Sequence, residues 1–134
     1  TDGHVDEVAR FVSPTTVACA VESDEDNENF RILRENEGIL RESRDQDGEP
    51  LTVIPLPLPG TVGEDVRLPA SYLNFFMGNR VVLVPQFSDP NDERALKIMG
   101  NLFPGRTAVG IDCRALIGGM GAVHCITREQ PKPG

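Results

Sequence analysis

Apolar and polar positions along the chain repeat one order of elements twice. Residues 5–12 alternate loosely and residues 17–21 are apolar, with a Ser-Pro-Thr-Thr turn between them, which predicts a hairpin of two strands. A polar, acidic stretch then precedes apolar residues at roughly helical spacing from Phe30 to Leu40, which predicts a helix. The short apolar run at 51–56 predicts a third strand. The first part of the chain is therefore expected to form a β-β-α-β unit.

The same order of elements returns 65 residues further along the chain. A Gly-Asn pair at 78–79 separates strands predicted over 70–77 and 80–87, because both residue types tolerate the positive φ of a tight turn. An apolar stripe between Ala95 and Phe103 then predicts a helix, and residues 106–112 predict a final strand. Such repetition is typical of architectures built from one supersecondary module. We expect two ββαβ units, spanning about 5–56 and 70–112.

Two local clusters carry side chains that could do chemistry. Glycines at 118, 119 and 121 allow a sharp turn and lead into residues 122–127, predicted as a closing strand that presents Cys125. A thiol with backbone amides around it is a candidate nucleophile. At the other end of the chain, His4 and Asp6 are two residues apart, so on an extended strand both side chains would lie on one face. Taken alone, each motif is common in proteins in which it has no catalytic role.

Composition excludes several classes of function. With 13 Lys and Arg against 21 Asp and Glu, the formal charge of -8 opposes binding to nucleic acid, which needs cations to replace phosphate counterions. An acidic surface can attract a cationic substrate, although acidity more often serves solubility alone. No apolar run approaches the roughly 20 residues that span a bilayer, so no membrane contact is expected. The 134 residues suffice for one domain with its own core.

The cysteines and the second histidine have structural interpretations as well. Cys19, Cys113 and Cys125 are an odd number without close pairing, which fits reduced thiols in the cytoplasm. The first two are expected to be core thiols. His124 would lie on the sheet face opposite its neighbour Cys125 and is expected to be structural. The His and Cys residues lack the close ligand pairs of zinc sites, so no metal is expected.

Six segments, spread over nearly the whole chain, are more specific together than either cluster. They are Thr-Asp-Gly-His-Val-Asp at 1–6, Leu-Pro-Ala-Ser-Tyr-Leu-Asn-Phe-Phe at 68–76, Val-Pro-Gln-Phe at 84–87, Leu-Phe-Pro-Gly-Arg at 102–106, Val-Gly-Ile-Asp at 109–112 and Val-His-Cys-Ile-Thr at 123–127. In order and spacing they resemble the C-terminal half of the agmatine deiminase and bacterial-type peptidylarginine deiminase family. The resemblance implies an α/β fold of the pentein type, a five-bladed propeller of ββαβ modules of which this chain would supply about two.

The resemblance also implies a reaction and roles for three residues. The family's Gly-His-x-Asp motif falls on Gly3, His4 and Asp6, so His4 would transfer protons and Asp6 would grip the substrate guanidinium. Cys125 would be the nucleophile that converts agmatine to N-carbamoylputrescine and ammonia through a covalent thiouronium, a step of putrescine biosynthesis. A cation beside the sulfur favours the thiolate, and charge-assisted hydrogen bonds would orient the planar group. The chain departs from the family at Ala122, where Asn is usual.

The implied partners are a small cationic guanidinium substrate and the N-terminal half of the same fold, without any cofactor. That half would supply a second guanidinium-binding Asp, a catalytic Glu and much of the binding surface for the substrate tail. Free or peptidyl arginine therefore stays open as the substrate, and so does the chemistry of an amidinotransferase. A noncatalytic fragment or interaction module is a further alternative. In the family homodimers are common.

Two expectations concern exposed parts of the chain. The Pro- and Gly-rich segment 55–69 is expected to be either a connector or the lining of a substrate entrance. Blades without their neighbours are expected to expose strand edges and apolar faces.

Overall fold

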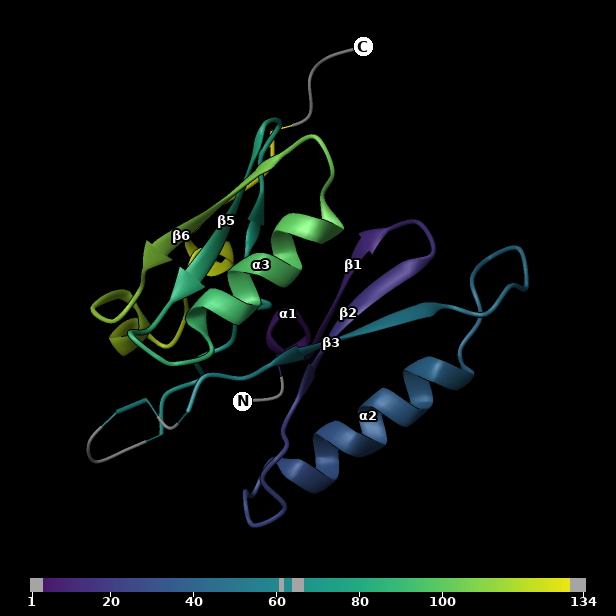
Figure 1. Ribbon diagram of the computed structural model, residues 1–134, viewed down its shortest axis with the longest axis horizontal. Coiled ribbons are helices and arrows are strands. Elements are labelled where there is room, and N and C mark those ends of the chain that lie inside the picture. The colour runs from purple at the N-terminus through teal and green to yellow at the C-terminus, as the bar shows by residue number, and fades with distance from the viewer. Residues whose placement is uncertain (1–3, 61, 64–66, 131–134) are drawn as a thin grey trace.

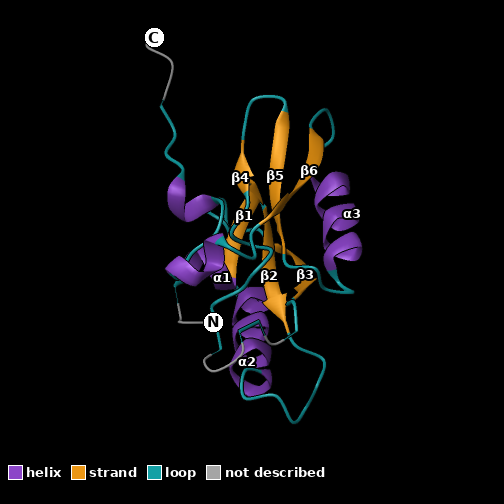
Figure 2. Cartoon of the chain, turned by 90° about the vertical axis from the view of Figure 1, so that its left-hand side faces the viewer, coloured by secondary structure: helices purple, strands orange, loops and turns teal. Residues whose placement is uncertain are grey.

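The computed structural model describes residues 4–60, 62–63 and 67–130, which form two small sheets with one longer helix beside each (Figures 1 and 2). The strands of the first sheet are β1 (Ala9–Ser13), β2 (Thr16–Val21) and β3 (Thr52–Pro57), and those of the second are β4 (Phe76–Met77), β5 (Val81–Gln86) and β6 (Thr107–Asp112). In each sheet the first two strands are antiparallel and the last two are parallel. The parallel connections run through α2 (Phe30–Glu42) and α3 (Asp92–Leu102). The predicted pair of ββαβ units is confirmed.

The 65-residue repeat is visible in the middle strand of each sheet. β2 begins at Thr16 and β5 at Val81, and both have six residues. Each middle strand has partners on both edges, and its apolar residues are largely buried. Strands buried in this way consist largely of consecutive apolar residues, so the apolar runs in the sequence predicted them.

One hydrophobic core joins the two units. Ala18 and Leu56 of the first sheet belong to the same buried cluster as Val84 of the second, and α2 and α3 contribute Leu33 and Met99. Tyr72, Leu73 and Phe75, from the segment between the units, are fully buried in that cluster. The connection between the units is therefore part of the core.

The segment 70–75 is not the strand that its apolar residues predicted; only Phe76 and Met77 pair as β4. The guanidinium of Arg10 donates hydrogen bonds to the carbonyls of Leu73 and Phe75. The Ser71 hydroxyl donates to the carbonyl of Glu7 over 2.8 Å. Since these side chains satisfy backbone groups that a strand would pair with a neighbour, the segment folds as a buried irregular connection.

The predicted strand over 5–12 is also wrong in its first half. Val5–Val8 form a single helical turn, α1, in which the Glu7 N–H donates to the His4 carbonyl over 3.0 Å. His4 has an extended backbone and precedes that turn. His4 and Asp6 therefore do not share the face of a strand.

The predicted closing strand over 122–127 is instead a short 3-10 helix, η2 (His124–Ile126). The glycine-rich stretch before it contains another 3-10 turn, η1 (Leu116–Gly119), and the left-handed backbone falls on Met120, with φ 64°. Residues 61 and 64–66 of the predicted connector lie outside the described residues, as does Gly3 of the Gly-His-x-Asp motif. None of the described helices has the length and the apolar character required to cross a membrane.

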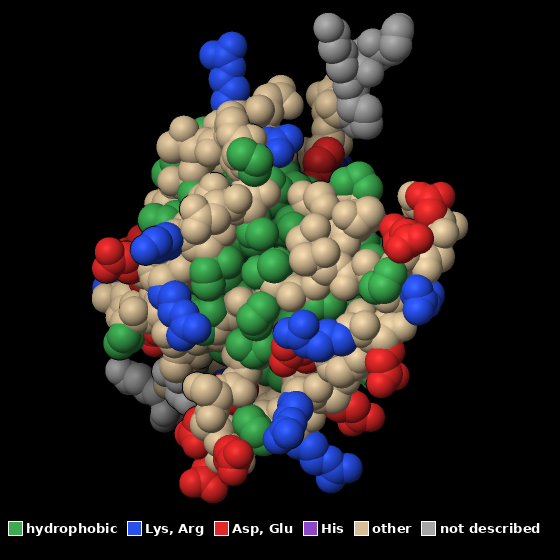
Figure 3. Space-filling view, turned by 45° about the vertical axis from the view of Figure 1, so that its right-hand side comes forward, with side chains coloured by type: hydrophobic (Ala, Val, Ile, Leu, Met, Phe, Trp, Pro, Cys, Tyr) green, Lys and Arg blue, Asp and Glu red, His purple; other side chains and the backbone are tan. Residues whose placement is uncertain are grey.

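Apolar side chains gather over one face of the molecule (Figure 3). Several large ones are well exposed, among them Val5, Phe11 and Ile126 at 74%, 58% and 67%. Exposed apolar surface is what the sequence predicted for blades without their neighbours.

Candidate active site

Three parts of the chain that are far apart in the sequence meet around Cys125. Asp6 comes from α1, Arg10 from β1, Asn74 from the connection between the units, and His124 from the same turn as the thiol. Cys125 itself is exposed, whereas Cys19 and Cys113 are buried and unpaired, as the sequence predicted. Burial raises the pKa of Cys113 and raises that of Cys19 to about 11.

Asn74 holds the turn that carries the thiol. Its side chain is fully buried, and its Oδ1 accepts hydrogen bonds from the backbone N–H groups of Ala122, His124 and Cys125 at 3.2, 3.0 and 3.3 Å. Its Nδ2 donates to Asp6 Oδ2 over 2.9 Å and to Cys125 Sγ over 3.1 Å. One amide oxygen thus accepts hydrogen bonds from three backbone N–H groups, which in a strand would be available to a neighbouring strand. This explains the 3-10 turn in place of the predicted strand.

Asp6 lies directly beside the sulfur. The Cys125 thiol is 3.6 Å from Asp6 Oδ2, and His124 Nδ1 is 2.7 Å from the same oxygen. Burial by itself raises the pKa of Asp6, but the hydrogen bond and charge of His124 and the hydrogen bond of Cys125 outweigh it and hold that pKa below its ordinary value. The carboxylate is therefore charged near neutral pH and next to the thiol.

The two histidines lie in different surroundings. His4 is exposed, and no described residue gives its imidazole a hydrogen bond or ion pair. Its role as proton carrier stays a prediction. The expectation that His124 lies on the sheet face opposite Cys125 is wrong, because the segment is a 3-10 turn and both side chains contact Asp6 Oδ2.

Arg10 stabilises the backbone on both sides of Asn74. Its guanidinium lies over the Phe75 ring, 4.0 Å from the centroid, and binds the carbonyls on both sides of Asn74. Burial lowers the pKa of Arg10, while the charges of Asp6, Glu129 and Cys125 raise it again. Arg10 therefore fixes the backbone of Asn74 and places a positive charge near the carboxylate and the thiol.

Sequence reasoning missed Asn74 and Arg10 as parts of the site. The signal for Asn74 was an amide inside a largely apolar predicted strand, where a buried amide has to find hydrogen-bond partners. Arg10 offered no comparable signal. Its partners are backbone carbonyls more than 60 residues away.

Gly121 makes room for the thiol. A Cβ at this position would lie 2.7 Å from Cys125 Cβ and 2.9 Å from its Sγ, closer than van der Waals contact allows. At Gly118, a Cβ would meet nothing within 4 Å. The glycine-rich segment thus has one position at which the fold of the site requires the absence of a side chain.

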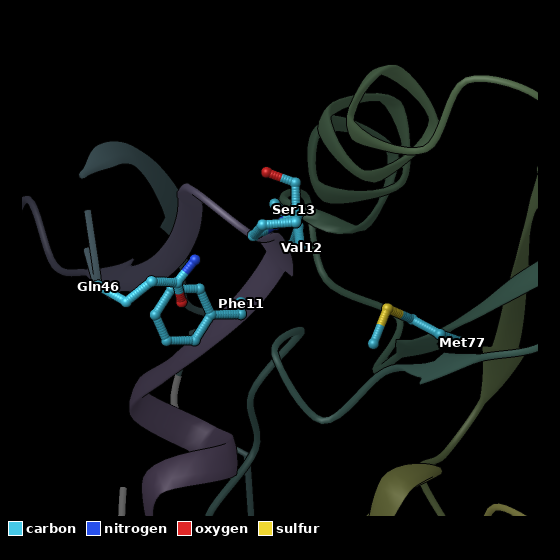
Figure 4. Close-up of a pocket in the computed structure, with 6 residues that line it drawn as sticks. Phe11, Val12, Ser13, Gln46 and Met77 are labelled. Carbon is cyan, nitrogen blue, oxygen red and sulfur yellow. The ribbon is translucent and has the colours of Figure 1, made fainter. Parts of the chain in front are cut away.

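A separate hollow of about 460 Å³ lies beside the β1–β2 turn, lined by Phe11, Val12, Ser13, Pro14, Gln46 and Met77 (Figure 4). Its lining contains neither a nucleophile of the thiol type nor a charged group. The described residues also contain no group of three or more His, Cys, Asp or Glu side chains that could hold a metal ion. The cluster at Cys125 is therefore the better candidate for chemistry, as a thiol beside a carboxylate that can hold a cation.

Comparisons with known proteins find relatives that match nearly the whole chain. The sequence model of the Porphyromonas-type peptidyl-arginine deiminases matches residues 1–131. A Legionella pneumophila protein, whose name assigns it provisionally to the agmatine deiminases, is 38% identical over 98% of this chain and 38% of its own length. The chain thus spans about two fifths of that relative.

Solved structures extend the likeness to the fold. A Porphyromonas gingivalis protein, provisionally titled an arginine deiminase, is 41% identical with a TM-score of 0.94, covering 98% of this chain and 39% of its own. The agmatine deiminase of Enterococcus faecalis is 31% identical with a TM-score of 0.91, covering 98% and 41%. An amidinotransferase of Microseira wollei, at 17% identity and a TM-score of 0.55, shares the fold alone. The expected partial pentein propeller is confirmed.

Proposed function

Because the chain belongs to the Porphyromonas-type peptidyl-arginine deiminase family, we propose that it carries the nucleophile of an enzyme that hydrolyses a guanidinium group. The observation that supports this most directly is the contact of Asp6 with Cys125, from opposite ends of the chain. A carboxylate next to a thiol can hold a cation with its carbon over the sulfur. The cation in turn favours the thiolate, so binding and activation support each other.

The proposed reaction proceeds in two halves. The Cys125 thiolate attacks the guanidinium carbon, a C–N bond breaks, and ammonia leaves with a proton supplied by an imidazole, the role proposed for His4. The carbon then remains on sulfur as a thiouronium. Water, deprotonated by the same imidazole, attacks that carbon, the C–S bond breaks, and a ureido product and the thiolate are released. No redox step occurs, and the sum is guanidinium plus water giving urea derivative plus ammonium.

We propose agmatine as the substrate, with N-carbamoylputrescine as the product and putrescine synthesis in the cytoplasm as its use. The agmatine deiminases of Enterococcus faecalis and Campylobacter jejuni, both about 30% identical over most of the chain, support this choice. A second candidate is free or peptidyl arginine, which the family and the more similar Porphyromonas gingivalis structure favour. The groups that would bind the substrate tail decide between them.

The proposal also assigns the N-terminal half of the fold as the partner that completes the site. Ammonia release from agmatine, measured with this chain alone and with the chain joined to that half, tests it. Activity should be undetectable in the first preparation, present in the second, and lost from the second with Cys125→Ala. Silence of a properly folded joined protein with agmatine, arginine and an arginine peptide would instead favour a noncatalytic module.

A further inference from the structure

Three described side chains contact the same oxygen of the Asp6 carboxylate. Asn74 Nδ2, His124 Nδ1 and Cys125 Sγ lie 2.9, 2.7 and 3.6 Å from Oδ2. No other described side chain makes a hydrogen bond to Oδ1. The side chains of Asp6 and His124 are 20% and 32% exposed, so a solute can reach the pair.

His124 is held firmly in its place. The backbone N–H of His124 donates to both the backbone carbonyl and the side-chain Oδ1 of Asn74. The backbone carbonyl of His124 accepts hydrogen bonds from the backbone N–H and the hydroxyl of Thr127. The imidazole therefore projects from a turn fixed on both sides. It contacts Asp6 without a rearrangement of the backbone.

We propose that His124 is a positioning residue for Asp6: it holds Oδ2, leaves Oδ1 for a cationic substrate, and weakens binding of that cation when it becomes protonated. The inference rests on the function proposed above, in which Asp6 binds the guanidinium. A neutral imidazole that donates its Nδ1–H leaves the pair with a net charge of −1. A protonated imidazole brings that net charge to zero, so an incoming cation loses most of the attraction.

Other charged groups near the pair do not reproduce this change. Arg10 carries a positive charge that the charges of Asp6 and Glu129 stabilise, and the contacts of Asp6 hold its pKa below the ordinary value. Cys125 carries an ionisable thiol, and His4 is a second imidazole near the start of the chain. The test therefore needs a measured quantity that does not depend on ionisation of the thiol and that distinguishes an effect of His124 from one of His4.

Comparing two alkylating agents of nearly equal shape removes the effect of thiol ionisation from the measurement. 2-Chloroacetamidine is a cation and 2-chloroacetamide is neutral, and both transfer their carbon to the Cys125 sulfur with loss of chloride. The ratio of their rates, followed by mass spectrometry on the chain itself, reports attraction of the cation because thiolate formation affects both. The buried Cys19 and Cys113 report folding, since unfolding exposes them to the neutral agent.

In the wild-type chain we expect the cation-to-neutral rate ratio to rise about 3- to 10-fold as the pH is raised across the range in which the chain stays folded. His124→Asn keeps an N–H donor near the Nδ1 position without a titrating charge, so its ratio should stay at the high value at every pH. His124→Ala should also be flat, but lower, because Oδ2 loses its donor. A pH step that persists in His124→Asn would assign the titration to His4 and overturn the inference, as would a wild-type ratio that does not vary with pH.

Asp6→Asn separates this inference from the proposed function. If the ratio at pH 8 falls toward 1 in Asp6→Asn, the carboxylate binds cations, and a failure of the His124 variants then counts against the inference alone. If the wild-type ratio is already near 1 at pH 8, Asp6 does not attract a cation, and both the inference and the proposed role of Asp6 fail. Ammonia release by the joined protein remains an independent test of the reaction.

Discussion

Replacing Asn74 by alanine should loosen the turn that carries the thiol while the two sheets stay in place. The Asn74 side chain is fully buried and connects the backbone of Ala122 and Cys125 with the carboxylate of Asp6. Its contacts reach residues 48 to 68 positions away in the sequence. One buried amide thus contacts both of the other segments that form the site.

The cost can be worked out from the groups that lose a partner. The N–H of Ala122 is buried and would be left unsatisfied, while that of Cys125 is near the surface and water can replace the amide. The N–H of His124 keeps the carbonyl of residue 74. With the lost donor to Asp6 added, Asn74→Ala should lower the free energy of unfolding by about 2–4 kcal/mol.

Urea denaturation followed by circular dichroism measures this loss, as a fall of the midpoint by about 1–2 M. The matched control is Asn79→Ala, the same substitution in an exposed hairpin turn, which should change stability by less than about 0.5 kcal/mol. Asn74→Ala should also change the rate at which 2-chloroacetamide alkylates Cys125, because the Nδ2–H hydrogen bond to Sγ is gone. Equal midpoints and equal alkylation rates for the two variants would refute the view that this amide organises the site.

Two further substitutions test neighbouring contacts. Gly121→Ala should cost about 1–3 kcal/mol, since its Cβ would overlap Cys125, while Gly118→Ala, where space is open, should cost less than about 0.5; equal urea midpoints for the pair would contradict the close approach. Arg10→Met should lower stability by about 1–3 kcal/mol through the loss of two hydrogen bonds to carbonyls and of the contact with Phe75. Arg10→Lys should recover only part of this in the same denaturation assay, because one ammonium does not reproduce the planar fork, and full recovery would show that charge alone matters.

The repeated units were predictable because their middle strands are buried and paired on both sides. Such strands need continuous apolar residues, and the runs at 17–21 and 81–84 supply them at the same offset as the observed strands. The helices between the parallel strands, α2 and α3, were predictable because each has apolar residues at helical spacing on the face that packs against the core. Local pattern and tertiary environment agree in these elements.

The segments 70–75 and 122–127 looked like strands and are not, because side chains distant in sequence satisfy their backbones. Arg10 binds the carbonyls of the first, and Asn74 binds the N–H groups of the second. An apolar run shows that a segment is buried, and it does not show what pairs with its backbone. Residues 70–75 are buried, whereas in 122–127 only Ala122 and Val123 are. The apolar run therefore predicted burial correctly for the first segment only, and hydrogen bonding for neither.

The one helical turn of α1 has the largest consequence for the chemistry. On a strand, residues two apart share a face, whereas in a helical turn they point about 200° apart. With Val5–Val8 helical, Asp6 faces the thiol and His4 precedes the turn with its side chain exposed. The imidazole within reach of the Asp6 carboxylate is then that of His124, brought there by the 3-10 turn that Asn74 organises. The two residues that local spacing placed on one face are thus separated, and the imidazole that contacts Asp6 belongs to a histidine 118 positions away in the sequence.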